Sequence, residues 1–316
     1  MIQSIHIPES LTPESLLPFS VKLRDSPKEK NYVLNFRNVG HVEPFGMLFL
    51  AALIRQFVKA RKNEQGKECR ISVENYQDKS YPSFMGLFKS FGLNHGNAPG
   101  EACGSGTYIP LTRLPISRIT REARDAFVHQ AQIIDNEALK IARVLSRSEH
   151  GDLTDTLTYS IRELMRNVVE HGQTTHIWYA AQYWPSKNRV EVAILDEGVG
   201  LLATLKNNPK LNVESTEIAL ALALQPGVSG IAKSNRKIEG DWVNSGYGLY
   251  MTSSLCKSGG DFLICNDTHA LSLCAEETTS HMCSYEGLAI RMVLDTSRIK
   301  DLNAALSEFR KAAIKK

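Results

Sequence analysis

The sequence lacks the long apolar runs of a membrane protein and the leader of a secreted one. Its longest apolar candidate, residues 44–54, is shorter than the ~18 residues that a membrane-spanning helix needs. The N-terminus shows no basic stretch followed by an apolar core, which is the pattern of a secretory signal. We therefore expect a cytoplasmic protein with no membrane partner.

A strong charge of either sign is missing too. The chain has 37 Lys and Arg against 34 Asp and Glu, a formal net charge of +3 at pH 7. Nucleic-acid-binding proteins usually carry a larger basic excess, so the composition makes no clear case for nucleic acid. The basic tail at residues 309–316 is the local exception, and such tails usually solvate a terminus.

Closely spaced cysteine pairs are also absent. Zinc sites commonly use pairs about two to four residues apart, whereas the nearest cysteines here are nine apart. We expect buried, reduced thiols, because cysteine is frequent in protein cores. The six cysteines stand at positions 69, 103, 256, 265, 274 and 283.

The length and composition that are present predict two globular domains. The chain has 316 residues, of which 42% are hydrophobic and 22% charged. A loop pattern at residues 94–106 precedes the expected boundary near residue 110. Before it, strand and helix patterns alternate, which predicts a parallel or mixed sheet flanked by helices. These patterns cover residues 32–36 (strand), 44–62 (helix), 69–73 (strand) and 82–91 (helix).

The second part also reads as α/β. We expect one long helix over residues 117–147, a second from about residue 152 to 172, and then two strands at residues 176–184 and 189–196. A polar, glycine-containing region with one helix follows at residues 201–245. A glycine-flanked helix, three strand patterns and a terminal helix complete the chain.

Three motifs in this part carry candidate chemistry. On the helix ending near residue 172, Glu163, Asn167 and His171 are four apart and share nearly one face. Alone, this pattern is more typical of a solvated polar face closed by a glycine. The second motif is Asp196 at a strand end, followed by Gly198 and Gly200, which is typical of a carboxylate facing a pocket or of a simple turn.

The third motif opens the glycine-flanked helix. Gly246, Gly248 and Leu249 stand at its start, where backbone N–H groups and the positive end of the helix dipole suit a phosphate. In isolation this is also an ordinary loop entering a helix.

The order and spacing of these motifs resemble the ATP-binding boxes of the GHKL superfamily, which includes gyrase, heat-shock chaperones, histidine kinases and mismatch-repair ATPases. The resemblance covers about residues 120–296. The segment Glu-Leu-x-x-Asn-x-x-x-His-Gly is closer to the anti-sigma-factor kinase and histidine-kinase branches. The resemblance implies an α+β sandwich (the Bergerat fold) that binds ATP and Mg²⁺.

The resemblance also implies roles for individual residues. Asn167 is expected to coordinate Mg²⁺, and Glu163 to act as the general base. Asp196 is expected to accept a hydrogen bond from the adenine amino group. Gly198 and Gly200 make room for the base, while the residues expected along the triphosphate are Gly246, Gly248 and Leu249. Lys233, in the lid at residues 201–245, either reaches the phosphates or belongs to a solvated run of charges.

One departure argues against a conventional histidine kinase. Such kinases need a phospho-accepting histidine in a Ser-His-Glu-Leu-Arg-like setting on a separate helix. His129 and His150 precede the ATP-binding motifs, but neither has that setting.

The first 110 residues resemble, more weakly, the STAS domain of sulfate transporters and anti-sigma-factor antagonists. The likeness rests on the strand and turn patterns and on the segment Pro44-Phe45-Gly46-Met47. It implies a protein partner. The turn at residues 43–46 lacks the hydroxyl that regulated relatives phosphorylate, so we expect a fixed docking surface there instead, against either the ATP domain or a partner.

We therefore expect an α/β protein with a STAS-like domain (1–110), a helical connector (111–147), a GHKL domain (148–300) and a basic C-terminal helix or tail (301–316). The favoured function is an ATP-operated regulatory switch with slow ATPase activity. A Ser/Thr protein kinase of the anti-sigma-factor type and a non-enzymatic ATP-binding scaffold stay as alternatives. A homodimer is open, because GHKL relatives often dimerise.

Overall fold

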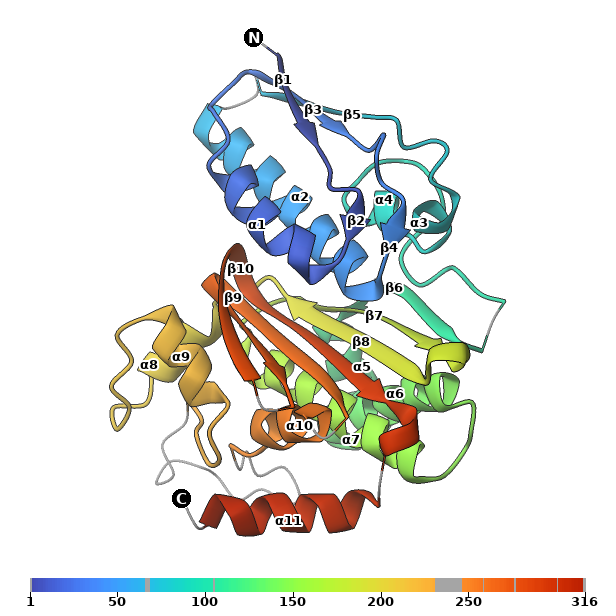
Figure 1. Cartoon of the computed structure of the whole chain (residues 1–316), viewed down its shortest axis with the longest axis vertical. Helices are drawn as coiled ribbons and strands as arrows, with labels where there is room; N and C mark the ends of the chain where they lie inside the picture. Colours follow the sequence, from blue (N-terminus) through green and yellow to red (C-terminus); the bar gives the residue numbers. More distant parts are fainter. Residues whose placement is uncertain are drawn as a thin grey trace.

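The computed structural model describes residues 2–65, 69–104, 106–230, 246–257, 259–275, 277–299 and 301–314. The protein is mixed α/β, with one antiparallel and two parallel sheets (Figure 1). No helix in these ranges is both long and apolar enough to cross a membrane.

The N-terminal unit contains the parallel sheet that its sequence pattern predicts. Strand order is β1-β3-β5, and the strands pair in parallel register. Gly86, with a φ of 90°, divides the helix expected at residues 82–91 into two, because few other residues adopt that conformation. The elements are β1 (Ile2–His6), β2 (Ser10–Leu11), α1 (Pro13–Arg24), β3 (Asn31–Asn35), β4 (His41–Val42), α2 (Pro44–Gln65), β5 (Arg70–Glu74), α3 (Ser80–Phe84) and α4 (Leu87–Ser90).

The second sheet is antiparallel, with strand order β6-β7-β8-β10-β9. Strands β7 (His176–Trp184) and β8 (Arg189–Asp196) have the predicted bounds. The three strand patterns expected near the C-terminus form two long strands, β9 (Gly260–Cys274) and β10 (Glu277–Asp295). The sequence did not predict the edge strand β6 (Tyr108–Pro115), whose two prolines are tolerated because the strand pairs on one side only.

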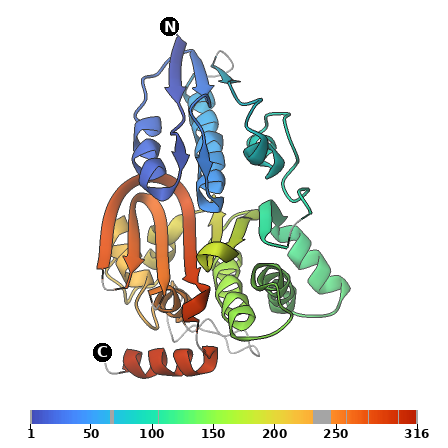
Figure 2. The same cartoon turned by 45° about the vertical axis from the view of Figure 1, so that its right-hand side comes forward.

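Helices cover one face of this sheet (Figures 1 and 2). The single helix expected over residues 117–147 is two helices, because the chain turns at Phe127, which has a φ of 55°. Two helices, not one, occupy the described part of the region after Gly200. The helices are α5 (Ile116–Asp125), α6 (Gln130–Ser146), α7 (Asp152–His171), α8 (Gly200–Lys206), α9 (Thr216–Ala223), α10 (Gly248–Lys257) and α11 (Leu302–Ile314). Short 3-10 turns lie at Pro185–Lys187 and Thr296–Arg298.

The N-terminal unit covers the opposite face of the sheet. Alternation along β7 shows this, since successive side chains of a strand point to opposite faces. Ile177 and Tyr179 belong to the core formed with helices α6 and α7. Trp178 and Ala180 belong to the core formed with α1 and α2. Figure 2 shows α1 and α2 lying above the sheet, with α7 below it.

The turn before α2 makes one of these contacts. Phe45 is only 1% exposed and stacks on Phe49, whose ring in turn lies 5.1 Å from that of Tyr285 in β10. The Phe45 N–H donates to the Glu191 carboxylate of β8 at 3.0 Å. The turn at residues 43–46 therefore docks against the C-terminal sheet, as its sequence predicts.

A buried charge cluster lies beside this contact. Glu43 pairs with Arg189 at 2.9 Å and with Arg291 at 3.4 Å. Arg291 also binds Glu191, at 3.1 Å, and Asp261. Burial raises the pKa of the Glu191 carboxyl, and the positive charge of Arg291 opposes this shift. The two arginines compensate the buried carboxylates, as buried charges require.

The cysteines and the C-terminal helix differ in part from expectation. All six cysteines are free, but Cys103 and Cys274 are exposed because they lie in a loop and at a hairpin end. Within the described ranges, no three His, Cys, Asp or Glu side chains form a metal-binding group. The basic terminal helix α11 is anchored, because Leu306 packs with Met251 and Leu255.

Candidate functional site

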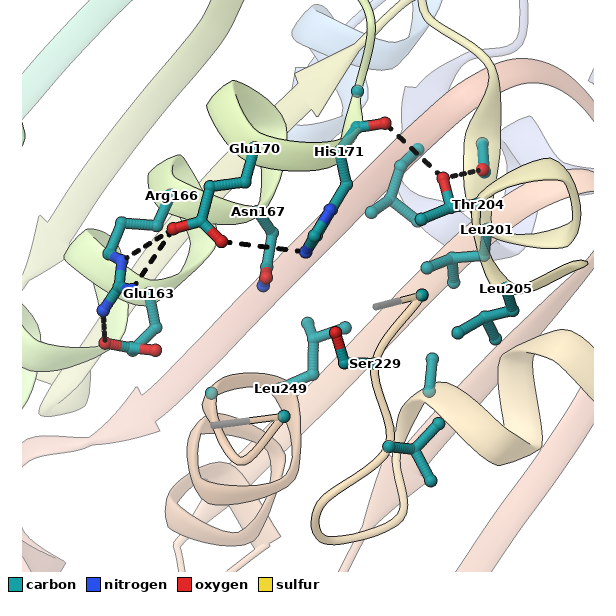
Figure 3. Close-up of a pocket in the computed structure, with 18 of the residues that line it drawn as sticks. Glu163, Arg166, Asn167, Glu170, His171, Leu201, Thr204, Leu205, Ser229 and Leu249 are labelled. Atoms are coloured by element: carbon teal, nitrogen blue, oxygen red, sulfur yellow. Dashed lines mark hydrogen bonds and ion pairs between the residues drawn. The ribbon is translucent and has the colours of Figure 1, made fainter. Parts of the chain in front are cut away.

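The three sequence motifs meet at one hollow on the helical side of the sheet. It is bounded by α7, the end of β8, α8 and the start of α10 (Figure 3). Of the predicted site residues, the lining includes Glu163, Asn167, Asp196, Gly200, Gly246, Gly248 and Leu249.

Helix α7 presents its polar face to the hollow. Glu163, Asn167 and His171 all line it, as their spacing of four predicts. The Asn167 Nδ2 atom is buried and has no hydrogen-bond partner within the described residues. A buried amide left in this state costs about 1–3 kcal/mol. A water molecule, an ion or a ligand in the pocket could satisfy this group.

Glu163 is held between two arginines and a helix N-terminus. Its Oε1 accepts from Arg162 at 3.1 Å and from Arg166 at 3.4 Å. Its Oε2 would lie 2.5 Å from a Cβ placed on Gly248. A side chain at position 248 would therefore displace the Glu163 carboxylate from its place beside the start of α10.

Asp196 is the last residue of β8 and is 1% exposed. Its Oδ1 accepts a hydrogen bond from the Gly198 N–H at 2.8 Å. Burial raises the pKa of this carboxyl to about 7, against the opposing effect of backbone hydrogen bonds from Gly198 and Leu288. The group therefore changes charge near neutral pH.

Different neighbouring atoms leave no room for a side chain at the two glycines after Asp196. Gly200 lines the pocket, with a φ of 70° and no room beside the Asn266 side chain. Gly198 is not among the lining residues. A Cβ on it would lie 1.7 Å from the carbonyl oxygen of Gly172. Because Gly198 has no side chain, the end of α7 can approach the backbone at this position.

Asn266 joins the pocket wall to the sheet, and sequence reasoning missed it. Its Oδ1 accepts from the N–H groups of Leu201 and Leu202, at 3.1 and 3.4 Å. Its Nδ2 donates to the Gly287 carbonyl oxygen at 2.7 Å. The start of α8 is fixed to β9 and β10 through this one buried side chain.

Several other lining residues were also missed. Arg166 and Glu170 form an ion pair at 3.2 Å, and Glu170 lies 3.7 Å from His171, whose pKa is lowered by burial (Figure 3). Their spacing of three and seven from Glu163 was the available signal. Thr204 and Ser229 add hydroxyls, and the apolar wall consists of Leu201, Leu205, Ala223, Val228, Leu249 and Leu288.

Lys233, expected at the phosphates, lies outside the described residues, as does the last third of the predicted lid, residues 231–245. Among the residues described, the pocket thus combines an apolar wall, one buried carboxylate and a row of charged and amide side chains on α7. This division suits a ligand with a flat apolar part and a polar, charged part. No family model and no curated protein sequence matches this chain.

Proposed function

We propose that the hollow binds Mg-ATP and that the chain is an ATP-operated regulatory switch with slow ATPase activity. The main support is convergence: three motifs separated by up to 85 residues of sequence, from Glu163 to Gly248, line one pocket. Each motif alone has an ordinary structural reading, but their meeting in one hollow is what an ATP site of the GHKL type requires.

The adenine end of the site would lie at Asp196. A buried carboxylate can accept a hydrogen bond from the adenine amino group, whereas guanine carries a carbonyl oxygen there and would leave Asp196 unpaired. The apolar side chains of Leu201, Leu205 and Leu288 line the same pocket and can pack on the base. Asp196 would therefore both orient the base and select it.

The polar end would lie between α7 and α10. Mg²⁺, when bound, neutralises phosphate charge, and Asn167 would hold it through its side-chain oxygen. Asn167 lines the pocket, and its orphaned Nδ2 group would be free to donate to a phosphate oxygen. Backbone N–H groups at Gly248 and Leu249 would bind phosphate oxygens. Glu163 would accept the proton of an attacking water, and Arg162 and Arg166 fix its orientation.

The architecture supports a GHKL-type sandwich next to a STAS-like unit. The helices α5 to α7 and α10 lie on one face of a five-stranded antiparallel sheet. The parallel strands β1, β3 and β5 form the other unit, which would receive a protein partner. We place the boundary between the units before Tyr108, because β6 pairs with β7 of the larger sheet.

Titration calorimetry tests the binding step. Wild-type protein should bind ATP with Mg²⁺ and discriminate against GTP. Asp196→Asn should weaken ATP binding by ~1–3 kcal/mol, because a charge-assisted hydrogen bond is lost. If wild-type protein binds neither nucleotide, or binds both equally, the proposal is wrong.

Radiolabelled ATP tests the activity. Released phosphate from purified protein, with no labelled polypeptide, supports an ATPase switch. Label transferred to a protein of an added cell lysate would make the chain a kinase. Binding without either outcome would make it a scaffold.

A further inference from the structure

The back of the proposed adenine site is held by the N-terminal unit. Glu197, the residue after Asp196, forms an ion pair with Arg55 from the middle of α2. The Arg55 Nε atom lies 3.2 Å from each Glu197 carboxylate oxygen, and Nη2 lies 3.1 Å from one of them. A residue 142 positions away in sequence thus holds the turn that carries Asp196.

Arg55 is itself fixed. Its guanidinium lies 4.1 Å from the ring centroid of Trp178 in β7, and its Nη1 donates to the Ser90 carbonyl oxygen at 3.0 Å. The side chains of Arg55 and Glu197 are 20% and 26% exposed. Their attraction is therefore screened less than that of a surface pair. Such a clamp can hold a loop in one position.

A second tether reaches Asp196 from β10. The Tyr285 hydroxyl donates to the Asp196 backbone oxygen at 2.6 Å. Tyr285 is 1% exposed, and its ring lies 5.1 Å from that of Phe49 on α2. The next residue, Glu286, exchanges two hydrogen bonds with the Gln56 side chain, at 2.7 and 3.1 Å. Helix α2 therefore supports the Asp196 turn directly and through β10.

We propose that Arg55 and Tyr285 are positioning residues for the Asp196 carboxylate, so that helix α2 sets the affinity and selectivity of the site for adenine. The inference rests on the proposed function. A recognition group must be held within about 0.5 Å and 10–20° of its productive geometry. The hydrogen bond from Gly198 fixes one carboxylate oxygen, Tyr285 holds the Asp196 carbonyl oxygen, and Arg55 holds the side chain of the next residue, Glu197.

The pocket thus has two sets of supports. The α7 and α10 residues at the phosphate end contact neither Arg55 nor Tyr285 through any hydrogen bond or ion pair found between the described residues. Disturbing α2 should therefore weaken recognition of the base and spare recognition of the phosphates.

Two ligands separate these ends in an experiment on the full-length protein. Dissociation constants are measured for ATP and for inorganic tripolyphosphate, both with Mg²⁺. Arg55→Gln and Glu197→Gln should each weaken ATP about five- to tenfold and lower the preference for ATP over GTP, while tripolyphosphate changes less than twofold. The double variant should match a single variant, because the two residues act as one unit.

Tyr285→Phe keeps the ring and removes only the hydroxyl, so it tests the second tether with little risk to folding. It should weaken ATP about threefold. The matched control is Arg118→Gln, which breaks the Arg118–Glu122 ion pair on α5 and should leave both ligands unaffected. Thermal unfolding of each variant checks that it is folded.

Three results would overturn the inference. Unchanged ATP affinity in folded Arg55→Gln and Tyr285→Phe would remove the positioning role. Equal losses for ATP and tripolyphosphate would mean a general loosening of the pocket. If wild-type protein fails to bind ATP, the proposed function fails and the inference with it, whereas the first two results leave ATP binding intact.

Discussion

The carbonyl oxygen of Gly172 occupies the space where a side chain on Gly198 would begin, 1.7 Å from the Cβ position. The N–H of Val199 donates to the same oxygen at 3.0 Å. The end of α7 and the turn after β8 are therefore in direct backbone contact. Two walls of the pocket, one bearing Asn167 and the other Asp196, are joined at this point.

Gly198→Ala should destabilise the protein by about 2–4 kcal/mol, because the backbone must move to admit a methyl group. Urea unfolding measures this change. Gly106→Ala is the control, since a Cβ there meets nothing within 4 Å, and it should shift stability by less than about 0.5 kcal/mol. Equal stability of the two variants would show that α7 and the turn separate easily.

Glu163→Gln should retain ATP binding and lose at least about 100-fold in turnover, because an amide cannot accept the proton of the attacking water. Steady-state hydrolysis and calorimetry on the same preparation separate the two effects. Glu122→Gln, on the surface of α5, should leave both unchanged. Hydrolysis by Glu163→Gln at the wild-type rate would exclude the general-base role.

ATP affinity should fall as the pH drops through about 7. The folded-state pKa of Asp196 is raised to about 7 by burial, and only the ionised carboxylate makes the charge-assisted bond to adenine. Affinity should be about tenfold lower at pH 6 than at pH 8. Asp196→Asn should lose that part of the pH dependence. Identical pH profiles for the two proteins would contradict the assignment.

The raised pKa of Asp196 also makes folding stability depend on pH, in the opposite direction to ATP affinity. The folded state holds the Asp196 proton more tightly than the unfolded state does. Its contribution to stability is therefore present at acid pH and is lost as the pH rises through about 7. Nucleotide binding and stability in the absence of nucleotide should thus respond to pH in opposite directions at this residue.

Phe45→Ala should reduce stability by about 3–5 kcal/mol, because a fully buried ring is removed from between the two units. Differential scanning calorimetry measures the loss, and Phe84→Ala is the control, since Phe84 is 39% exposed. Unaltered stability of Phe45→Ala would remove the turn at residues 43–46 from the contact.

The same turn should stay unphosphorylated. Mass spectrometry after long incubation with Mg-ATP should find no phosphate between residues 38 and 50.

Sequence patterns predicted elements well where one periodicity dominates. Strands β7 and β8 have their predicted bounds because apolar runs end at clear turn residues. The break between α5 and α6 was not predictable in this way. It occurs at Phe127, which carries neither the backbone freedom of glycine nor the restriction of proline, and a left-handed φ there leaves no trace in the pattern.

The candidate site was predictable in part for a similar reason. Residues on one helix or in one motif, such as Asn167 and Asp196, could be grouped by spacing. Asn266 and Arg55 reach the site region from other elements, and no local pattern connects residues so far apart in sequence. Tertiary packing alone brings them there.

The alternation along β7 has a consequence for how such a chain can change over generations. Trp178 and Ala180 complete a core with α1 and α2, while their neighbours complete another with α6 and α7. A recombinant that joined residues 1–100 of one homologue to the remainder of another would face a mismatched surface along a whole side of the sheet. Glu43 would also meet arginines that had not been selected beside it. We therefore expect a substitution on one side of this junction to be accompanied by a compensating substitution on the other.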